Sequence, residues 1–286
     1  MARHFINLFL AAAFFALVLP VQPVLGQTET EKEISKLIQD LGDDSFQTRE
    51  KASKRLLEIG EPALPALQKA LKSEDAEVRW RASRIYRTTT AKLFDAASKK
   101  AVEVTVPVVL PHAQLSGTVI YSDKKKSHIL TCSYGFYPND QWWGNGDGKP
   151  VKECEIEIGG KSYTGKVIYD DNNVGLTLVE IEKGGLPVAK FAKNKLEVHS
   201  TICQAGVGAN KQAKIRKGDV REKTEKGDPV YGIEIENGDG GAGIFALQDR
   251  ELYLHAVIWG VESEGGAPRV VSASEIATFL KDSKSK

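Results

Sequence analysis

The feature that most constrains this chain is a change in the spacing of its apolar residues near residue 101. Before it, apolar residues recur at helical spacing, beginning with Ile34, Leu37, Ile38 and Leu41 at positions i, i+3, i+4 and i+7. After it, short stretches alternate between apolar and polar residues and are separated by Gly, Asn, Asp and Pro. The change predicts an α+β multidomain chain, with a helical domain over residues 27–100 and a β domain over residues 101–286.

Residues 1–26 are typical of an export signal. Arg3 precedes an apolar run over residues 5–19, and a small-residue cleavage pattern stands before Gln27. The run is shorter than the roughly 20 residues that a membrane-spanning helix needs. We therefore expect a signal peptide and a periplasmic or secreted protein without stable membrane insertion after cleavage. An uncleaved anchor is the alternative.

The charge balance excludes some partners. The chain has 39 Lys and Arg residues against 38 Asp and Glu, and the signal removes only Arg3, so the expected mature charge is zero. A neutral chain has no global field that attracts nucleic acid or an anionic membrane. Hydrophobic residues at 41% and charged residues at 27% are typical of a folded globular protein. We expect a protein or peptide partner and no nucleic acid.

The helical half contains an internal repeat. Beyond the first helix, the pattern predicts a second that ends at Gly60, a third that begins at Pro62, and a fourth. The second and fourth helices match at an offset of 30 residues, which pairs Asp44 with Glu74, Arg49 with Arg79, Ala52 with Ala82, Ser53 with Ser83 and Lys54 with Arg84. The segment resembles a HEAT-like helical repeat, whose helix pairs bury their apolar faces by stacking.

The repeat carries a row of cations that has two interpretations. The row consists of Arg49, Lys51, Lys54, Arg55, Arg79, Arg81, Arg84 and Arg87. It could form a basic ridge for an acidic partner. Nearby acidic residues favour the other interpretation, which is solvated helix faces whose charges are offset by Glu50, Glu58, Glu74, Asp75 and Glu77.

The β half predicts an antiparallel barrel or sandwich. Its alternating stretches, STICQA and YGIEIE among them, recur every 10 to 20 residues and leave no room for the helices of a parallel sheet. Near the end of the chain, Ser272 and Glu275 form a capping box before Ile276, Phe279 and Leu280. We therefore expect one short helix to close the β domain.

Four pieces of the β half, in order, resemble trypsin-like serine proteases of the chymotrypsin fold, HtrA-type, over about residues 116–280. Residues 129–134 (ILTCSY) are similar to the piece that precedes the catalytic histidine, and residues 171–179 (DNNVGLTLV) to the piece with the orienting aspartate. Residues 238–245 (GDGGAGIF) are similar to the piece with the nucleophilic serine, and residues 257–260 (VIWG) to the strand that lines the cleft. The resemblance implies a trypsin-like double β-barrel.

The departures from the family pattern fall on the catalytic triad. Tyr134 stands at the position of the histidine, Gly175 at the aspartate and Gly240 at the serine. A phenol with a pKa near 10 is a poor base at neutral pH, and glycine has neither a carboxylate nor a hydroxyl. We therefore expect a pseudoprotease that binds protein or peptide or acts as a scaffold. The alternative is a serine-type endopeptidase homologue whose active site is relocated or non-standard.

Other residues are candidates for a rebuilt site. The mature chain has four histidines, His112, His128, His199 and His255, of which His128 and His255 lie in apolar strand patterns and are expected to be structural. Cys132 is a candidate nucleophile two residues before Tyr134. It is more simply a structural thiol, or one half of a disulfide with Cys154 or Cys203.

The glycine-rich turn has two interpretations of its own. The backbone N–H groups of Gly238 and Gly240 are candidates for a residual oxyanion-type site that binds a carbonyl or carboxylate. The alternative is that Gly238, Gly240, Gly241 and Gly243 make only a tight hairpin. The same glycines match G-x-G-x-x-G, but strand-like flanks on both sides exclude a dinucleotide site, so no cofactor is expected.

The loop after Tyr134 is a candidate binding loop because it is rich in aromatic residues, which are Phe136, Tyr137, Trp142 and Trp143. A small satellite core is the favoured alternative. Oxygen-bearing residues in the same loop suggest calcium, but the glutamate of an EF-hand loop is missing, so no metal is expected despite Asp140, Asn145 and Asp147. In a third interpretation, the helical repeat holds the partner and the β domain only supports it.

Overall fold

A computed structural model of the chain describes residues 28–137, 150–208, 211–248, 251–261 and 268–285. The predicted signal peptide, residues 1–26, lies outside the described residues, as do Trp142 and Trp143. The chain divides into two compact units, Met1–Tyr86 and Arg87–Lys286. No described helix is both long enough and apolar enough to cross a membrane.

The first unit is helical. Its elements are α1 (Glu29–Asp40), α2 (Phe46–Ile59), the 3₁₀ turn η1 (Glu61–Ala63), α3 (Leu64–Ala70) and the start of α4 (Ala76–Glu103). Each boundary has a local cause: Thr28 and Glu31 form a capping box before α1, and α2 ends at Gly60 with φ +70°. Apolar residues at helical spacing pack into one core, which includes Leu41, Leu56, Leu67 and Ile85. The expected order of helices is confirmed, although the third α-helix begins at Leu64 after η1 rather than at Pro62.

The internal repeat has a counterpart in the hydrogen bonds of this unit. Arg49 Nη1 donates to the carbonyl oxygens of residues 43 and 44 at 2.7 and 2.9 Å. Thirty positions later, Arg79 Nη1 donates to the carbonyl oxygens of residues 73 and 74 at 2.6 and 2.7 Å. Each guanidinium thus satisfies carbonyl groups of the loop that precedes its own helix. The matched sequence positions make the same contact.

The predicted row of cations is largely used for structure. Besides Arg49 and Arg79, Arg81 is buried and forms ion pairs with Glu50 and Glu77 at 2.7 and 2.6 Å. Arg49 also pairs with Glu77, and Arg55 with Glu33 and Glu58. These ion pairs offset part of the row's charge, in agreement with the second interpretation.

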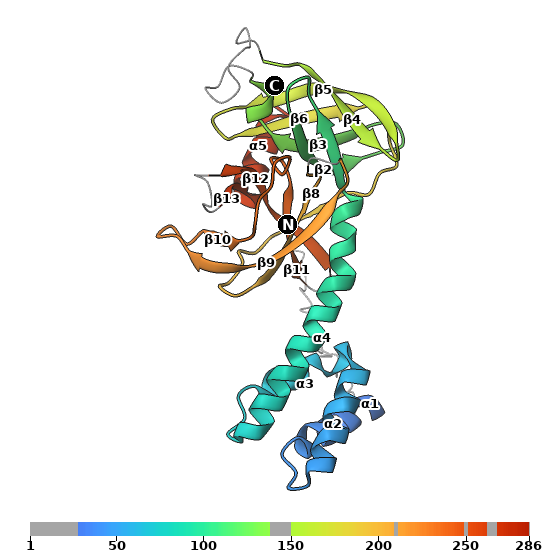
Figure 1. The fold of residues 1–286 in the computed structure, drawn as a ribbon, viewed down its shortest axis with the longest axis vertical. Coiled ribbons are helices and arrows are strands. Elements are labelled where there is room, and N and C mark those ends of the chain that lie inside the picture. The colour runs from blue at the N-terminus through green and yellow to red at the C-terminus, as the bar shows by residue number, and fades with distance from the viewer. Residues whose placement is uncertain (1–27, 138–149, 209–210, 249–250, 262–267, 286) are drawn as a thin grey trace, which may run out of the picture. The chain divides into compact units, whose positions relative to one another are not determined.

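A closed six-stranded barrel forms the first part of the second unit. Its antiparallel strands pair in the order β1-β2-β3-β6-β5-β4, and β1 pairs with β4 to close it (Figure 1). The strands are β1 (Thr105–Val109), β2 (Gln114–Ser122), β3 (Ser127–Cys132), β4 (Glu153–Ile158), β5 (Lys161–Asp171) and β6 (Leu176–Ile181). Alternate apolar residues fill the barrel, among them Val108, Leu115, Ile129 and Ile156.

The remaining strands form a seven-stranded sheet in the order β10-β9-β8-β11-β12-β13, with β7 paired in parallel to β12. They are β7 (Lys190–Phe191), β8 (Thr201–Gly206), β9 (Lys214–Lys223), β10 (Pro229–Gly232), β11 (Gly243–Gln248), β12 (Glu251–Val261) and β13 (Pro268–Ser272). The resemblance implied a second barrel, whereas these described strands form a sheet that is not closed into a barrel. Within this sheet, β10 ends at Gly232, earlier than the YGIEIE pattern predicts. Further along, the N–H of Glu236 donates to the Asp239 carboxylate at 2.7 Å rather than to a strand.

Helix α5 (Ala273–Asp282) closes the unit, as predicted. Ser272 and Glu275 form both bonds of the capping box. Ile276 and Phe279 are buried in a core that strands of both sheets share with Phe94 of α4. Since α4 continues to Glu103, the helix runs slightly past the predicted change of period, and the compact units divide within it rather than at residue 100.

Candidate functional site

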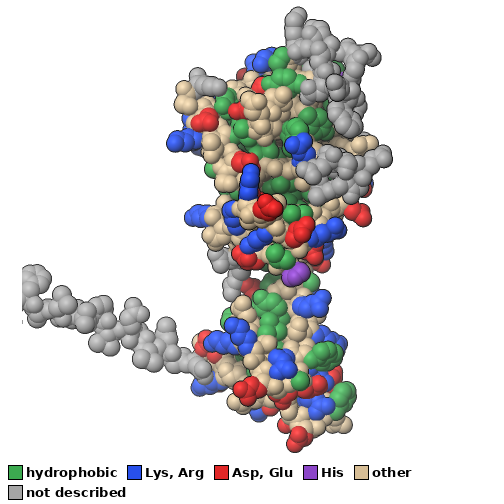
Figure 2. All heavy atoms as spheres, turned by 90° about the vertical axis from the view of Figure 1, so that its left-hand side faces the viewer, with side chains coloured by type: hydrophobic (Ala, Val, Ile, Leu, Met, Phe, Trp, Pro, Cys, Tyr) green, Lys and Arg blue, Asp and Glu red, His purple; other side chains and the backbone are tan. Residues whose placement is uncertain are grey.

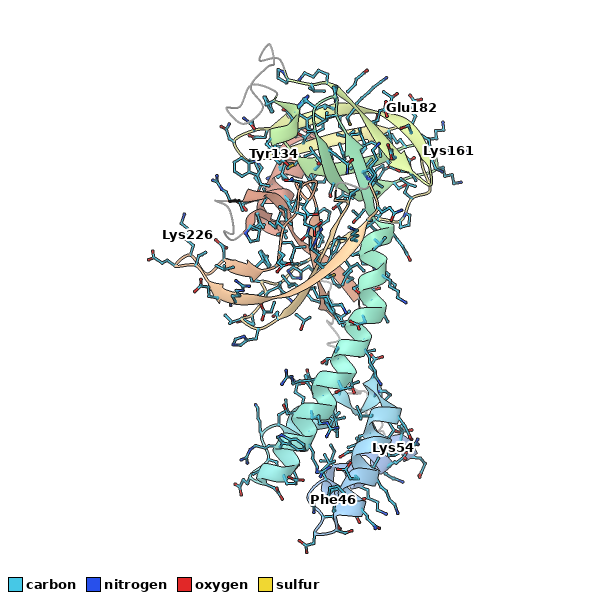
Figure 3. All side chains as sticks on the ribbon, in the orientation of Figure 1. Phe46, Lys54, Tyr134, Lys161, Glu182 and Lys226 are labelled. Carbon is cyan, nitrogen blue, oxygen red and sulfur yellow. The ribbon has the colours of Figure 1, made fainter. Side chains whose placement is uncertain are left out.

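The candidate site lies where the barrel adjoins the second sheet. The 3₁₀ turn η2 (Tyr134–Phe136) follows β3 and brings Tyr134 toward the turn at residues 236–243, which precedes β11. Figure 3 labels Tyr134 at this junction. Both segments belong to the pieces that carry the resemblance, so these two pieces do meet in space.

Ser116 of β2 fixes the glycine-rich turn. Its N–H donates to the carbonyl of Gly240 at 2.8 Å, and its Oγ donates to the carbonyl of Gly238 at 2.7 Å. The same Oγ accepts the N–H of Val207 at 2.9 Å. Ser116 is fully buried, so these bonds are shielded from water. One barrel residue therefore holds the turn and the end of β8 in register.

A buried ion pair supports the same turn from behind. Asp239 is fully buried, and its two carboxylate oxygens accept Arg216 Nη1 at 2.9 and 2.8 Å. Arg216 also pairs with Glu236. A carboxylate engaged in this way is not available as a base for a reacting group. Neither Arg216 nor Asp239 is among the site residues predicted from the sequence; the available signals were an arginine in an alternating strand and an aspartate between glycines.

Tyr134 fills the space beside Gly240. A Cβ placed on Gly240 would lie 2.6 Å from both Oη and Cε1 of Tyr134, and 3.0 Å from Sγ of Cys132. Real Cβ atoms do not approach neighbours that closely, so glycine is the residue that this packing accepts. Burial, together with nearby Cys132 and Asp239, raises the pKa of the Tyr134 phenol above its ordinary value. The phenol therefore stays protonated at neutral pH.

Trp259 fills the space beside Gly175 in a similar way. Gly175 has φ +87°, and a Cβ there would lie 2.4 Å from Cδ1 of Trp259. The carbonyl of Gly175 accepts the N–H of Ser133 at 3.0 Å, which places it beside the segment that carries Tyr134. The guanidinium of Arg269 stacks on the Trp259 ring, with Cζ 4.4 Å from the ring centroid. The structure thus brings Tyr134, Gly175 and Gly240 together, with an aromatic side chain against each glycine.

The residual backbone site stays a prediction. In the described part of the chain, the N–H groups of Gly238 and Gly240 donate to no carbonyl or side chain. Their carbonyl groups, by contrast, are held by Ser116. These two donors are therefore available to an acceptor.

The three cysteines are free and buried. The possible disulfide between Cys132 and Cys154 or Cys203 is therefore not formed, and the structural-thiol alternative agrees with the structure. Burial raises the pKa of Cys132 well above its ordinary value, and that of Cys154 and Cys203 to about 12. A buried thiol with a raised pKa is a weak nucleophile at neutral pH.

The histidines have structural surroundings. His112 Nε2 lies 2.9 Å from the Gly135 carbonyl, and His128 Nε2 lies 3.0 Å from Glu180. His199 is exposed at the surface. His255 is 5% exposed and stands at a register shift of β12, where burial lowers its pKa to about 4. None of these contacts places a histidine against Gly240.

The aromatic loop folds back where it is described. Phe136 is buried in the barrel core, and Tyr137 Oη donates to the Asp170 carboxylate at 2.6 Å. Burial and this bond raise the pKa of Tyr137 to about 12. The calcium candidates Asp140, Asn145 and Asp147 lie outside the described residues. Within the described ranges, no three His, Cys, Asp or Glu side chains are grouped to hold a metal ion.

Comparisons with solved structures decide the fold. A serine endoprotease from Yersinia pestis superimposes with a TM-score of 0.54 at 16% identity, covering 66% of each chain. The Rv3671c protease of M. tuberculosis gives a TM-score of 0.51 at 16% identity. The superposition on its inactive serine mutant covers 68% of the present chain and 91% of the Rv3671c chain. The superposition on its active form covers 67% of the present chain and 85% of the Rv3671c chain. The fold is that of trypsin-like serine proteases. No protein-family model and no curated protein sequence matches the chain.

The contact between Tyr134 and Gly240 predicts a coupled effect on stability. We expect Gly240→Ala to lower the free energy of unfolding by about 1–3 kcal/mol, because the added methyl group overpacks against the tyrosine ring. In a Tyr134→Ala background the same change should cost clearly less. Urea denaturation of the four proteins measures the difference. Gly260→Ala is the control, since no atom lies within 4 Å of its Cβ position. An equal cost in both backgrounds would contradict the packing argument.

Burial of His255 predicts a pH dependence of stability. Its pKa is about 4 in the fold and near 6.5 when unfolded, so the unfolded state binds the proton more readily. The contribution is complete above pH 6.5 and is lost as the pH falls toward 4, by roughly 3 kcal/mol in total. Urea midpoints measured across this range should fall less steeply for His255→Gln. The exposed-site variant His199→Asn should follow the original protein, and identical slopes for all three would contradict the assignment.

Proposed function

We propose that this chain is a non-catalytic homologue of trypsin-like serine proteases that acts in protein or peptide binding or as a scaffold. The observation that carries the proposal is the packing of Tyr134 into the space beside Gly240. A hydroxyl at this position would have no room, and the neighbouring phenol has a raised pKa that makes it a poor base. Nucleophile and base are therefore missing together.

The third triad position supports the same conclusion. Gly175 lacks a carboxylate, and the ring of Trp259 occupies the space that an aspartate side chain would need. Without a triad, a bound substrate would gain at most the roughly 10³ to 10⁴-fold enhancement over water that an oxyanion hole and binding provide. A chain that keeps the protease fold without the residues of the catalytic triad is better suited to a binding or scaffolding role.

A hydrolase with a relocated site is the alternative. Cys132 is the nearest nucleophile, with Sγ 3.0 Å from the Cβ position of Gly240. Its burial and raised pKa argue against this role, because the reactive form is the thiolate.

The helical unit completes the proposal. We infer that it is a HEAT-like repeat, because the matching contacts of Arg49 and Arg79 follow the repeat in the sequence. Such repeats commonly present extended binding surfaces. We also propose that the mature protein is exported, on the basis of the signal pattern in residues 1–26.

Absence of peptidase activity is the direct test. The purified mature chain should show no labelling by a fluorophosphonate serine probe and no cleavage in a mixed peptide library, because no described side chain supplies the nucleophile at position 240. A trypsin-like protease run in parallel controls both assays. Gly240→Ser should also stay unlabelled, since Tyr134 remains in place of a base. If the pure protein cleaves peptides and the Cys132→Ala variant does not, the result would support the relocated site and contradict the proposal.

Export predicts a processed N-terminus. When the full chain is expressed in a bacterium, we expect the extracytoplasmic fraction to contain a protein that begins at Gln27, as read by mass spectrometry. Ala12→Arg places a charge within the apolar run and should leave the unprocessed chain in the cytoplasm. Ala2→Ser, outside the run, is the control. An unprocessed original chain in the membrane fraction would support the anchor alternative instead.

A further inference from the structure

The helical unit has a pocket whose chemistry the repeat itself does not require. It measures about 220 Å³ and lies between α2 and α4, where it is lined by the apolar residues Leu57 and Trp80 and by the buried side chain of Ile85. We call it the α2–α4 pocket. All of its lining residues belong to the first compact unit, so the site is complete within that unit.

Two large aromatic residues of these helices are exposed. The exposed fractions are 62% for Phe46 and 57% for Trp80, although neighbouring apolar residues such as Leu56 are fully buried. Figure 2 shows hydrophobic side chains at the surface of the helical unit among Lys and Arg side chains. Exposing this much apolar surface costs free energy that burial against a partner would recover.

Arg81 organises the aromatic residues. Its guanidinium lies 6.0 Å from the centroid of the Phe46 ring and 5.9 Å from that of Trp80. The side chain is held by Glu50 and Glu77, and it donates to Ser53 Oγ at 3.2 Å. A buried and fully engaged arginine does not change rotamer easily, so the aromatic surface is preorganised. Preorganised aromatic and arginine side chains are typical of binding hot spots.

The charges around the pocket favour an acidic ligand. Lys54, Arg81 and Arg84 line it together with a single acidic residue, Glu50, which pairs with Arg81. Lys54 is exposed on α2 (labelled in Figure 3), and Arg84 lies 5.8 Å from the Trp80 centroid. The lining is therefore net positive although the chain as a whole is nearly neutral. A local positive rim around an apolar centre complements a carboxylate-rich segment that carries an apolar side chain.

We propose that the α2–α4 pocket binds an acidic peptide segment of a partner protein. An apolar side chain of that segment packs on Leu57 and Trp80, and its flanking carboxylates lie near the cationic rim that Lys54 and Arg84 form. This inference rests on the proposed role in protein binding, but it does not depend on the state of the protease-like site.

The test measures peptide binding by the whole mature chain. Fluorescently labelled Asp- and Glu-rich peptides with one central Leu, Phe or Trp are titrated, and binding is followed by anisotropy. Two control peptides replace the central residue by Ser or the acidic residues by Lys. We expect the acidic peptides with an apolar centre to bind most tightly, with an affinity that falls as salt is added.

Variants then locate the site. Trp80→Ala should weaken binding about tenfold or more, and Lys54→Glu with Arg84→Glu should do the same. Lys36→Glu is the matched control, since Lys36 is an exposed lysine of α1 away from the pocket and its change should leave the affinity unaltered. Circular dichroism and urea midpoints show that each variant is folded.

Three results would overturn the inference: no binding by any acidic peptide, equal binding by the pocket variants and the original chain, or preference for anionic lipid vesicles over the peptides. None of them bears on the peptidase assay, which reads the β unit. Cleavage activity would in turn refute the proposed function without affecting peptide binding by the α2–α4 pocket.

Discussion

The arrangement of the β unit depends on the buried side chain of Ser116. A single hydroxyl and its own N–H hold the carbonyl groups of Gly238 and Gly240, while the hydroxyl accepts the N–H of Val207. Since Ser116 belongs to the barrel, and its partners lie just after β8 and just before β11 of the second sheet, these bonds fix the two parts against each other. Behind the turn, Arg216 Nη1 donates to both carboxylate oxygens of Asp239. These contacts hold the carbonyl side of the turn, while the N–H groups of Gly238 and Gly240 have no partner among the described residues.

Under the proposed function, this support explains how the fold persists with Tyr134, Gly175 and Gly240 at the three triad positions. In an enzyme, the space between the two halves must admit a substrate and hold reacting groups at hydrogen-bond distance. Here Tyr134 and Trp259 occupy the space beside Gly240 and Gly175, so packing replaces open volume. Packing of this kind contributes stability, whereas an open catalytic site stores strain and unpaired polar groups. The two glycines and the two aromatic residues therefore form a consistent set.

Local patterns made much of the fold predictable. The helices follow from apolar spacing and from caps at Thr28, Gly60 and Ser272, because these signals act within a few residues. The meeting of Tyr134 and Gly240 was accessible only through the resemblance, since residues about a hundred positions apart leave no periodic trace. The order of the pieces along the chain, rather than any single motif, carried that information.

Contacts between residues far apart in the sequence could not be predicted from local patterns. The hydrogen bonds between Arg216 and Asp239 join β9 to the turn before β11, and neither residue is unusual within its own segment. Likewise, Cys132 and Cys203 belong to different cores, which spacing cannot reveal, so a disulfide remained possible until the fold was known. The end of β10 at Gly232 depended on the competing bond of Glu236 in the turn. Each difference comes from a tertiary contact that outweighs a local preference.

The aromatic residues of the two units differ in exposure, and this difference bears on where a partner could bind. In the β unit, Tyr134 and Trp259 pack against glycines and are half-buried, so they offer a ligand less surface than fully exposed rings would. In the helical unit, Phe46 and Trp80 remain more than half exposed while Arg81 holds them in place. Binding free energy comes mainly from burying apolar surface that is exposed and already ordered. By this criterion the helical unit exposes more ordered aromatic surface than the β unit does at its glycine positions, which is why the proposed peptide site is placed in the helical unit.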